Sequence, residues 1–282
     1  MEKKKLLLTD LDGTLLTSDK RISPATRSAL DRFTEAGNIF AISTGRAAES
    51  ALNVQQSMGL DYPGSFVVSY NGASIQRTDI GPDGKRTYAS VFRTGVGLDL
   101  VPEVFAMADA CSVHCHTYND NYILSRAWDK EMDFYRRHIK TPVIIDEHIM
   151  NQIQEAPCKM IAIELEDRSK IERLREELHA KFSDRLTTIF SNPWYLEIFP
   201  ADAGKGNALR KLAGLLNIPI ENTMAAGDAE NDISMIQAAG LGIAMCNGDE
   251  KVKAAADVIT EKDNDHDGLE PYLQDDGAAL HN

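Results

Sequence analysis

The chain has 282 residues, of which 43% are hydrophobic and 26% charged, and its formal net charge at pH 7 is −13. This composition is typical of a folded globular protein and excludes disorder as the dominant state. A general binder of nucleic acid or of anionic membranes usually carries the opposite charge. We therefore expect neither nucleic acid nor a membrane as a partner.

Two further features indicate a cytoplasmic protein. Four cysteines are too few for a secreted scaffold held together by disulfides. The apolar run after the basic start is three leucines long, whereas a signal peptide has about 7–15 apolar residues and a membrane span about 20. For the oligomeric state we expect a monomer or a small homo-oligomer.

Short apolar strands alternate with amphipathic helices in the first third of the chain. The first predicted helix has Ser23 as N-cap, Pro24 at its first position and Gly37 after its end. Strands are predicted at 5–9, 38–43 and 65–69, and helices at 24–36 and 47–58. This spacing indicates a parallel sheet with right-handed crossovers.

The middle of the chain follows a different pattern, which begins with a polar turn at 81–86. Hairpin-like strands are predicted at 87–92, 112–118 and 121–125, and further strands near 158–164, 187–190 and 195–199. Helices are predicted near 97–109, 128–137 and 169–180. Closely spaced elements of both kinds are typical of an α+β domain.

The alternating pattern returns at the end of the chain. Helices are predicted at 204–215, 231–239 and 249–255, and strands at 223–227, 241–245 and around Val258 and Ile259. The predicted fold class is therefore α/β. A Rossmann-like parallel-sheet core, made of residues 1–84 and 191–282, is split in sequence by an inserted α+β domain at 85–190.

Carboxylates follow two of the predicted core strands. Asp10 comes directly after the first strand, with Asp12 two residues further, and Asp228 follows the strand at 223–227. Ligands bind where parallel strands end, and both of these strands end at the same edge of the sheet. The repulsion among the carboxylates would be relieved by a divalent cation, and hard oxygen ligands favour Mg²⁺. Taken alone, residues 10–13 could also be a capped turn.

Two other segments have the features of phosphate-binding loops. Thr44 and Gly45 follow the second strand at the start of a helix, and Lys205 lies between two glycines at the start of another. Helix N-terminal amides, a hydroxyl and an ammonium all suit an anion. Arg46 either reaches a substrate oxygen or forms a salt bridge on the helix surface.

The residues at these positions resemble a known family. DLDGT (10–14), STGR (43–46), GKG (204–206) and GDAEND (227–232) are similar to the four motifs of the haloacid dehalogenase (HAD) superfamily of phosphohydrolases. NGA (71–73), the inserted domain and the tail DNDHDGLEPYL (263–273) resemble its Cof-type sugar-phosphatase branch, which has a C2-type cap. The resemblance implies a Mg²⁺-dependent phosphatase that hydrolyses small phosphorylated metabolites, such as sugar phosphates, through an aspartyl phosphate.

The resemblance also implies roles for the carboxylates. Asp10 is the expected nucleophile, and Asp12 is the expected general acid and base. The expected magnesium ligands are Asp10, the backbone carbonyl of Asp12 and Asp228, with Asp232 supporting them.

For the phosphoryl group, Thr44 and Lys205 are the expected binding residues, with Gly45 and Arg46 beside them and Asn231 in support. Replacement of Lys205 should then reduce catalysis and change stability little, because a cation placed for chemistry contributes little to packing.

Several alternatives stay open at this level. A phosphomutase of the same superfamily would return the phosphoryl group to a second hydroxyl, and a non-catalytic phospho-acceptor module would only hold it. Ala229 and Cys246 depart from the family's usual motifs, although neither is a predicted ligand.

Two segments outside the motifs also contain potential ligands. CSVHCH (111–116) combines thiols and imidazoles, but its spacing matches no common zinc site. His114 and His116 share one strand face and could contact substrate, or they are ordinary sheet residues. The acidic run at 261–267 lacks the glycine and the terminal glutamate of a calcium loop, so we interpret it as a loop near the substrate rim of the core.

Overall fold

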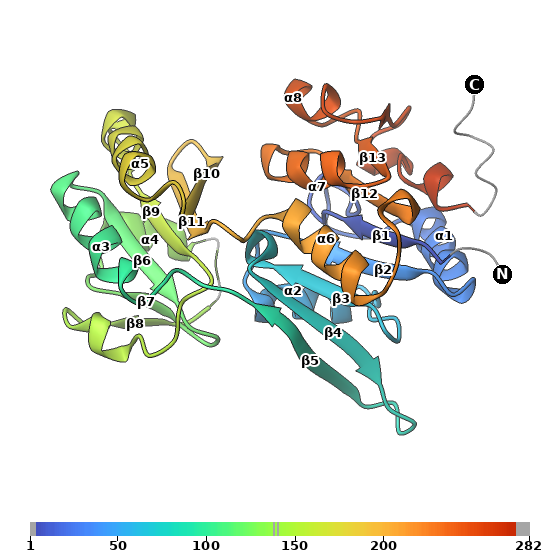
Figure 1. Ribbon diagram of the computed structural model, residues 1–282, viewed down its shortest axis with the longest axis horizontal. Coiled ribbons are helices and arrows are strands. Elements are labelled where there is room, and N and C mark those ends of the chain that lie inside the picture. Colours follow the sequence, from blue (N-terminus) through green and yellow to red (C-terminus); the bar gives the residue numbers. More distant parts are fainter. Residues whose placement is uncertain (1–3, 138, 140, 275–282) are drawn as a thin grey trace. The chain divides into compact units, whose positions relative to one another are not determined.

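The computed structural model describes residues 4–137, 139 and 141–274, and the chain forms two compact units (Figure 1). Unit 1 comprises Met1–Phe92 and Gly204–Asn282, and unit 2 comprises Arg93–Ala203. Both boundaries lie further along the chain than the expected ones at 84/85 and 190/191. The observed boundaries differ from the expected ones because β5 (Arg86–Arg93) extends the sheet of unit 1, whereas β10 (Leu186–Asn192) and β11 (Tyr195–Pro200) pair in the sheet of unit 2.

The sheet of unit 1 has the strand order β14-β13-β12-β1-β2-β3-β4-β5. From β14 to β3 all neighbours are parallel, which confirms the predicted α/β core, and β4 is antiparallel to β3. The bounds are β1 (Leu6–Thr9), β2 (Ile39–Ser43), β3 (Phe66–Ser69), β4 (Ser74–Ile80), β12 (Thr223–Gly227), β13 (Leu241–Ala244) and β14 (Val258–Ile259).

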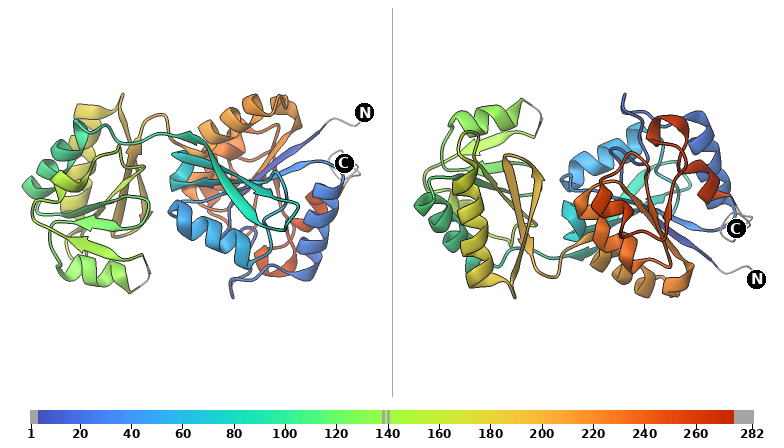
Figure 2. Two further views of the ribbon diagram at one scale, coloured as in Figure 1. Left: turned by 90° about the horizontal axis from the view of Figure 1, so that it is seen from below. Right: turned by 90° about the horizontal axis from the view of Figure 1, so that it is seen from above.

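Helices cover both faces of this sheet because successive strand residues point to opposite sides. The face that contains Leu7 and Phe40 packs against α1 (Pro24–Glu35), and α2 (Ala48–Ser57) adds Val54 to the same cluster. The opposite face packs against α6 (Lys205–Leu215) and α7 (Ile233–Ala238), as Figure 2 shows, and α8 (Glu250–Lys253) packs beside α7. The predicted cap of α1 is confirmed, since Ser23 Oγ accepts a hydrogen bond from Thr26 N.

The register of the parallel strands sets the position of the site. Thr9, the last residue of β1, is level with Ile42 of β2 on one side and with Ala226 of β12 on the other. The three strands therefore end at nearly the same height, and the loops that follow them lie at one edge of the sheet.

Unit 2 has a sheet with the order β10-β11-β9-β6-β7-β8. On one face it packs against α3 (Leu100–Ala110) and α5 (Arg168–Phe182), and on the other against α4 (Lys130–Arg136). Its other strands are β6 (His114–Tyr118), β7 (Ile123–Ser125), β8 (Val143–Ile145) and β9 (Met160–Ile163). The predicted α+β class is confirmed, although β4 and β8 lie outside the predicted strands.

Short 3₁₀ helices occupy Tyr70–Gly72, Ile149–Gln152, Ile220–Asn222, Glu230–Asp232, Asn264–His266 and Glu270–Leu273. The start of the helix predicted at 231–239 belongs to the fourth of these, and α7 follows it. Among the described residues no helix is long and apolar enough to cross a membrane.

Candidate active site

Asp10 and Lys205 meet at the carboxyl edge of the unit 1 sheet although 195 positions separate them. Asp10 continues the β1 ladder, because its backbone N–H donates to the carbonyl of Ala226 at 2.9 Å. Lys205 is the first residue of α6 and is fully buried. Its Nζ lies 2.6 Å from Asp10 Oδ1 and 2.5 Å from Asp232 Oδ1. The two halves of the core thus contribute to one ion-pair network.

Asp232 is fully buried, and both of its carboxylate oxygens have protein partners. Oδ1 contacts Lys205, and Oδ2 accepts hydrogen bonds from the backbone N–H groups of Asp228 and Ala229, both at 3.0 Å. Asp232 therefore fixes the loop that contains Asp228. Ala229 still takes part through its backbone, so its missing polar side chain leaves this contact intact.

The residues present fit a divalent cation. Asp10, Asp228 and Asp232 each have an oxygen within 4.8 Å of an oxygen of the other two, and this is the metal-ligating group found among the described residues. Burial raises the pKa of Asp10 to about 8; Lys205 opposes this shift, and the charges of Asp232 and Asp228 add to it. Burial also raises the pKa of Asp228 to about 6. These buried carboxylates are hard oxygen ligands that lie close together, and a divalent cation such as Mg²⁺ would offset both their burial and their mutual repulsion.

The side chain of Asp12 is not part of this acidic group. Arg46 Nη2 lies 2.8 Å from Asp12 Oδ2 and 3.0 Å from Oδ1, and Lys20 Nζ lies 2.8 Å from Oδ1. Partial burial acts to raise the pKa of Asp12, but the hydrogen bonds and charges of Lys20 and Arg46 outweigh it, so that the pKa is lowered. Of the two alternatives for Arg46, the structure has a salt bridge, and its partner is the candidate acid–base residue.

Thr44 directly follows β2, and Asn231 lies in the 3₁₀ helix Glu230–Asp232 that follows β12 at the same edge of the sheet. Thr44 is buried at the end of β2, and its Oγ1 accepts a hydrogen bond from the N–H of Arg46 at 3.2 Å. Asn231 Nδ2 donates to Asn71 Oδ1 at 2.9 Å, and a Cβ on Gly45 would lie 3.2 Å from Asn71 Nδ2. Asn71 thus links the β2 loop to the β12 loop.

Glycines let two loops approach the site closely. Gly13 has φ +82°, and a Cβ there would overlap the carboxylate of Asp228. A Cβ on Gly206 would overlap the backbone carbonyl of Ser234, so this glycine allows α6 to pack closely there.

Sequence reasoning did not single out two residues that shape the site. Thr14 Oγ1 donates to Asp228 Oδ1 at 2.7 Å, and Asn247 Nδ2 donates to the carbonyl of Gly13 at 2.8 Å. Thr14 is the last residue of the DLDGT motif (10–14), so the sequence did indicate that it lies near the site. Asn247 follows β13, and only the folded chain shows what its amide contacts.

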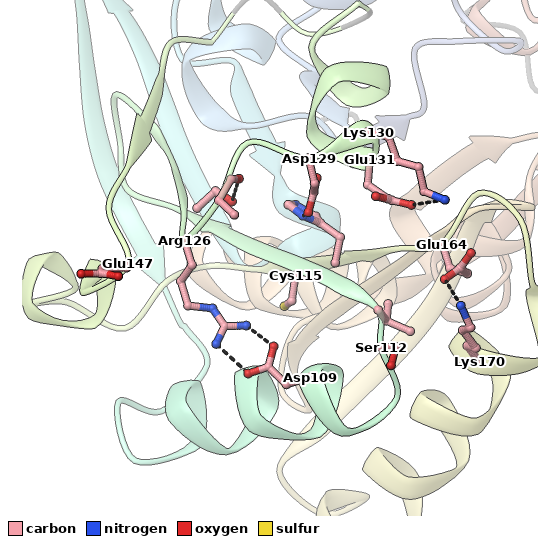
Figure 3. A pocket seen from close by; sticks show the side chains of 14 residues that line it. Asp109, Ser112, Cys115, Arg126, Asp129, Lys130, Glu131, Glu147, Glu164 and Lys170 are labelled. Carbon is pink, nitrogen blue, oxygen red and sulfur yellow. Dashed lines mark hydrogen bonds and ion pairs between the residues drawn. The ribbon is translucent and has the colours of Figure 1, made fainter.

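Unit 2 contains a separate cavity of about 610 Å³ (Figure 3). Its walls come from α3, α4, α5 and the ends of β6, β7 and β9. Arg126 pairs with Asp109, and Lys170 pairs with Glu164. Each of these two cations therefore has a carboxylate of the cavity wall beside it.

His114 and His116 lie on one face of β6, as predicted, and form a hydrogen-bonded chain. Asp129 Oδ2 lies 2.7 Å from His114 Nδ1, and His114 Nε2 lies 3.0 Å from His116 Nδ1. The cysteines of the CSVHCH segment belong to the hydrophobic cluster on the opposite face. Within the described parts of the chain, these thiols and imidazoles form no metal-ligating group.

The buried His116 should make the protein less stable in acid. Burial lowers its pKa well below the ordinary value, and the charges of His114 and Lys159 lower it further. Below a pH of about 6.5 the unfolded chain therefore binds a proton at His116 that the folded chain does not bind. The free energy of unfolding then falls by up to about 1.4 kcal/mol for each unit by which the pH decreases. Urea unfolding between pH 5 and 7.5 should show this slope, and His116→Gln should reduce it.

The exposed His179 on α5 provides the control for this experiment. His179→Gln should keep the pH dependence of wild type. An unchanged slope in His116→Gln would contradict the assignment.

Comparisons with known proteins agree with this geometry. Residues 7–273 match the model of the haloacid dehalogenase-like hydrolases. The 5-amino-6-(5-phospho-D-ribitylamino)uracil phosphatase YitU of Bacillus subtilis is 29% identical, with 98% of each chain covered. Phosphatase YwpJ of the same organism is 28% identical over 93% of this chain and 96% of its own. The crystal structure of a haloacid dehalogenase-like hydrolase from Bacteroides thetaiotaomicron has a TM-score of 0.79 at 28% identity, covering 96% of this chain and 98% of its own.

The chain therefore belongs to the haloacid dehalogenase-like hydrolase family, in its Cof-type branch. Within this family it is a phosphatase, an enzyme that hydrolyses phosphoric monoesters.

Proposed function

We propose that this phosphatase is Mg²⁺-dependent and hydrolyses small phosphorylated metabolites, sugar phosphates and related monoesters, through an aspartyl phosphate on Asp10. The observation that carries the proposal is the fully buried Lys205, which bridges Asp10 and Asp232 beside Asp228. A buried cation among carboxylates at a strand-end edge is suited to neutralising a phosphoryl group, whose transfer depends mostly on positioning and charge. The substrate in the name of YitU, a phosphorylated ribityl compound, supports the substrate class.

In the first half of the proposed reaction, a carboxylate oxygen of Asp10 attacks phosphorus while the bond to the leaving-group oxygen breaks. Asp12 gives that oxygen a proton, and the alcohol departs. In the second half, water attacks the aspartyl phosphate and gives a proton to Asp12, which regenerates both aspartates and releases phosphate.

Other residues of the chain hold the phosphoryl group during both halves. Lys205 neutralises charge on its oxygens, and the Thr44 hydroxyl donates a hydrogen bond to it. Mg²⁺, bound by Asp10, the backbone carbonyl of Asp12 and Asp228, would supply further neutralisation of the phosphoryl charge.

Metal removal tests the cofactor. Turnover of p-nitrophenyl phosphate should be abolished by EDTA and restored by Mg²⁺, whereas Ca²⁺ should restore it poorly because it prefers a looser shell with more ligands. The magnesium, zinc and calcium contents of the stripped sample should be measured by mass spectrometry as a control. Full activity in a verified metal-free sample would refute the proposed dependence.

A screen of phosphorylated metabolites for phosphate release tests the substrate class. The panel should contain sugar phosphates, polyol phosphates including the phosphorylated ribitylaminouracil, and nucleotides as an unrelated class. Free phosphate from the first two groups supports the proposal. An isomerised phosphate ester would instead indicate a phosphomutase, and a stable phosphoprotein without turnover would indicate a phospho-acceptor.

A further inference from the structure

The loop between β1 and α1 contains a lysine in an unusual backbone conformation. Lys20 has φ +60°, in the left-handed region that residues with a Cβ rarely adopt. The turn around it is closed by two backbone hydrogen bonds of 2.8 Å, from Lys20 N to the carbonyl of Thr17 and from Thr17 N to the carbonyl of Arg21. Such strain persists only where the surrounding structure determines it, and it occurs often at functional sites.

This conformation brings the Lys20 ammonium to Asp12, within 2.8 Å of Oδ1. Arg46 contacts the same carboxylate from the loop after β2, with Nη2 at 2.8 Å from Oδ2 and Nε at 3.2 Å from Oδ2. Arg46 Nη2 also lies 3.0 Å from Oδ1, so the guanidinium contacts both oxygens of the carboxylate. Lys20 adds a second cation on Oδ1, the oxygen to which Arg46 has its longer Nη2 contact.

The exposure of this ion pair argues against a role in stability. The side chains of Lys20 and Asp12 are 60% and 38% exposed. Exposed pairs of this kind contribute little to folding. The ion pair of Lys20 therefore does not offset the strain of its backbone in the free energy of folding. The direction of the Asp12 carboxylate, in contrast, matters for proton transfer.

The loop itself is held by residues 263–267 of the acidic run near the C-terminus. Asp265 accepts hydrogen bonds from Ser18 N at 2.7 Å and from Ser18 Oγ at 2.6 Å. Asp267 accepts a hydrogen bond from Ser23 Oγ at the other end of the loop. Asn264 Nδ2 donates to the carbonyl of Leu16 at 2.8 Å. Residues 263–267 thus form hydrogen bonds to both sides of the turn that contains Lys20.

We propose that Lys20 is a positioning residue, which orients the Asp12 carboxylate toward the leaving-group oxygen, and that residues 263–267 hold Lys20 in place for this purpose. The inference rests on the proposed function, in which Asp12 gives its proton to that oxygen as the P–O bond breaks. Lys20 itself neither gives nor takes a proton in either half of the reaction.

Two substrates of nearly the same shape test the proposal. Phenyl phosphate has a poor leaving group that needs the proton, whereas p-nitrophenyl phosphate has a good one that needs it far less. Lys20→Met should lower kcat/KM for phenyl phosphate by about tenfold or more and for p-nitrophenyl phosphate by less than about threefold. Lys20→Arg should restore most of the loss. We use kcat/KM because it covers only the steps up to departure of the leaving group.

The neighbouring Arg21 provides a matched control, because it is an exposed cation of the same loop that pairs with Asp19. Arg21→Met should leave both values of kcat/KM near wild type. An equal loss on the two substrates in Lys20→Met would indicate a direct substrate contact and overturn the proposal. So would unchanged kinetics on both.

A double variant tests the part assigned to residues 263–267. Asp265→Ala should reduce kcat/KM for phenyl phosphate selectively, and it should add little in the Lys20→Met background, because both changes remove the same interaction. Fully additive effects would overturn this part.

The outcome for wild type and Asp12→Asn separates this inference from the proposed function. If wild type releases no phosphate, or Asp12→Asn retains full activity on phenyl phosphate, the proposed function fails. If both behave as proposed and Lys20→Met shows no leaving-group dependence, only the inference about Lys20 fails.

Discussion

Asp10→Asn should lower kcat by at least about a thousandfold while the protein stays folded, because the variant lacks the carboxylate that we propose as the nucleophile of the covalent intermediate. The structure supports intact folding of this variant. Asp10 shares a buried region with Asp228 and Asp232, and burial raises its pKa to about 8. A neutral amide removes one negative charge from that region and keeps an oxygen that can accept from Lys205.

The measurement is kcat with p-nitrophenyl phosphate, together with a melting curve and a mass spectrum that excludes deamidation back to aspartate. Asp184→Asn, an exposed position in unit 2, provides the control and should keep wild-type kcat. Turnover of Asp10→Asn within tenfold of wild type would refute the nucleophile assignment.

Lys205→Ala should reduce kcat/KM by about 10²–10³, comparable to the loss of a preorganised oxyanion donor. The structure corrects the accompanying expectation that stability changes little. Lys205 is fully buried, and its removal leaves the buried carboxylate of Asp232 without its cation. Breaking a buried ion pair in this way lowers the free energy of unfolding by about 3–5 kcal/mol.

Kinetics should therefore be measured at a temperature where circular dichroism shows the variant folded, and stability should be measured separately by urea unfolding. The control is Arg210→Ala, an exposed cation on the same helix α6, which should change neither quantity by much. A variant of Lys205 with reduced stability and wild-type kcat/KM would leave this lysine a structural residue only.

Local sequence signals were sufficient for most of the core. The strands β1, β2, β3 and β12 are short apolar runs closed by polar or glycine residues, and α1 has its cap and its proline at the expected positions. Because parallel strands end at one edge, the positions of Asp10, Asp12 and Asp228 in the sequence were enough to predict that the loops containing them lie together. Lys205 starts a helix and follows no strand of this sheet, so its place was predicted from the resemblance of its motif.

Elements that depend on their neighbours could not be predicted in this way. β4 (SIQRTDI) has apolar residues only at Ile75 and Ile80, and β8 has three residues. Both are strands because an adjacent strand supplies the hydrogen bonds. The same reason moved the domain boundaries, since the sheet that β5 joins is decided by pairing partners far away along the chain.

The roles of individual site residues divide along the same line. The short motifs carry a resemblance that predicted the family and the phosphatase class, which the comparisons confirm, and the same resemblance implies Asp10 as the nucleophile. Only the tertiary structure decided that Asp232 has both oxygens engaged by Lys205 and by backbone N–H groups, and that Arg46 and Lys20 hold Asp12. Hydrogen bonds and burial depend on which atoms come close together in the folded chain. The distances between those atoms cannot be read from the order of the residues alone.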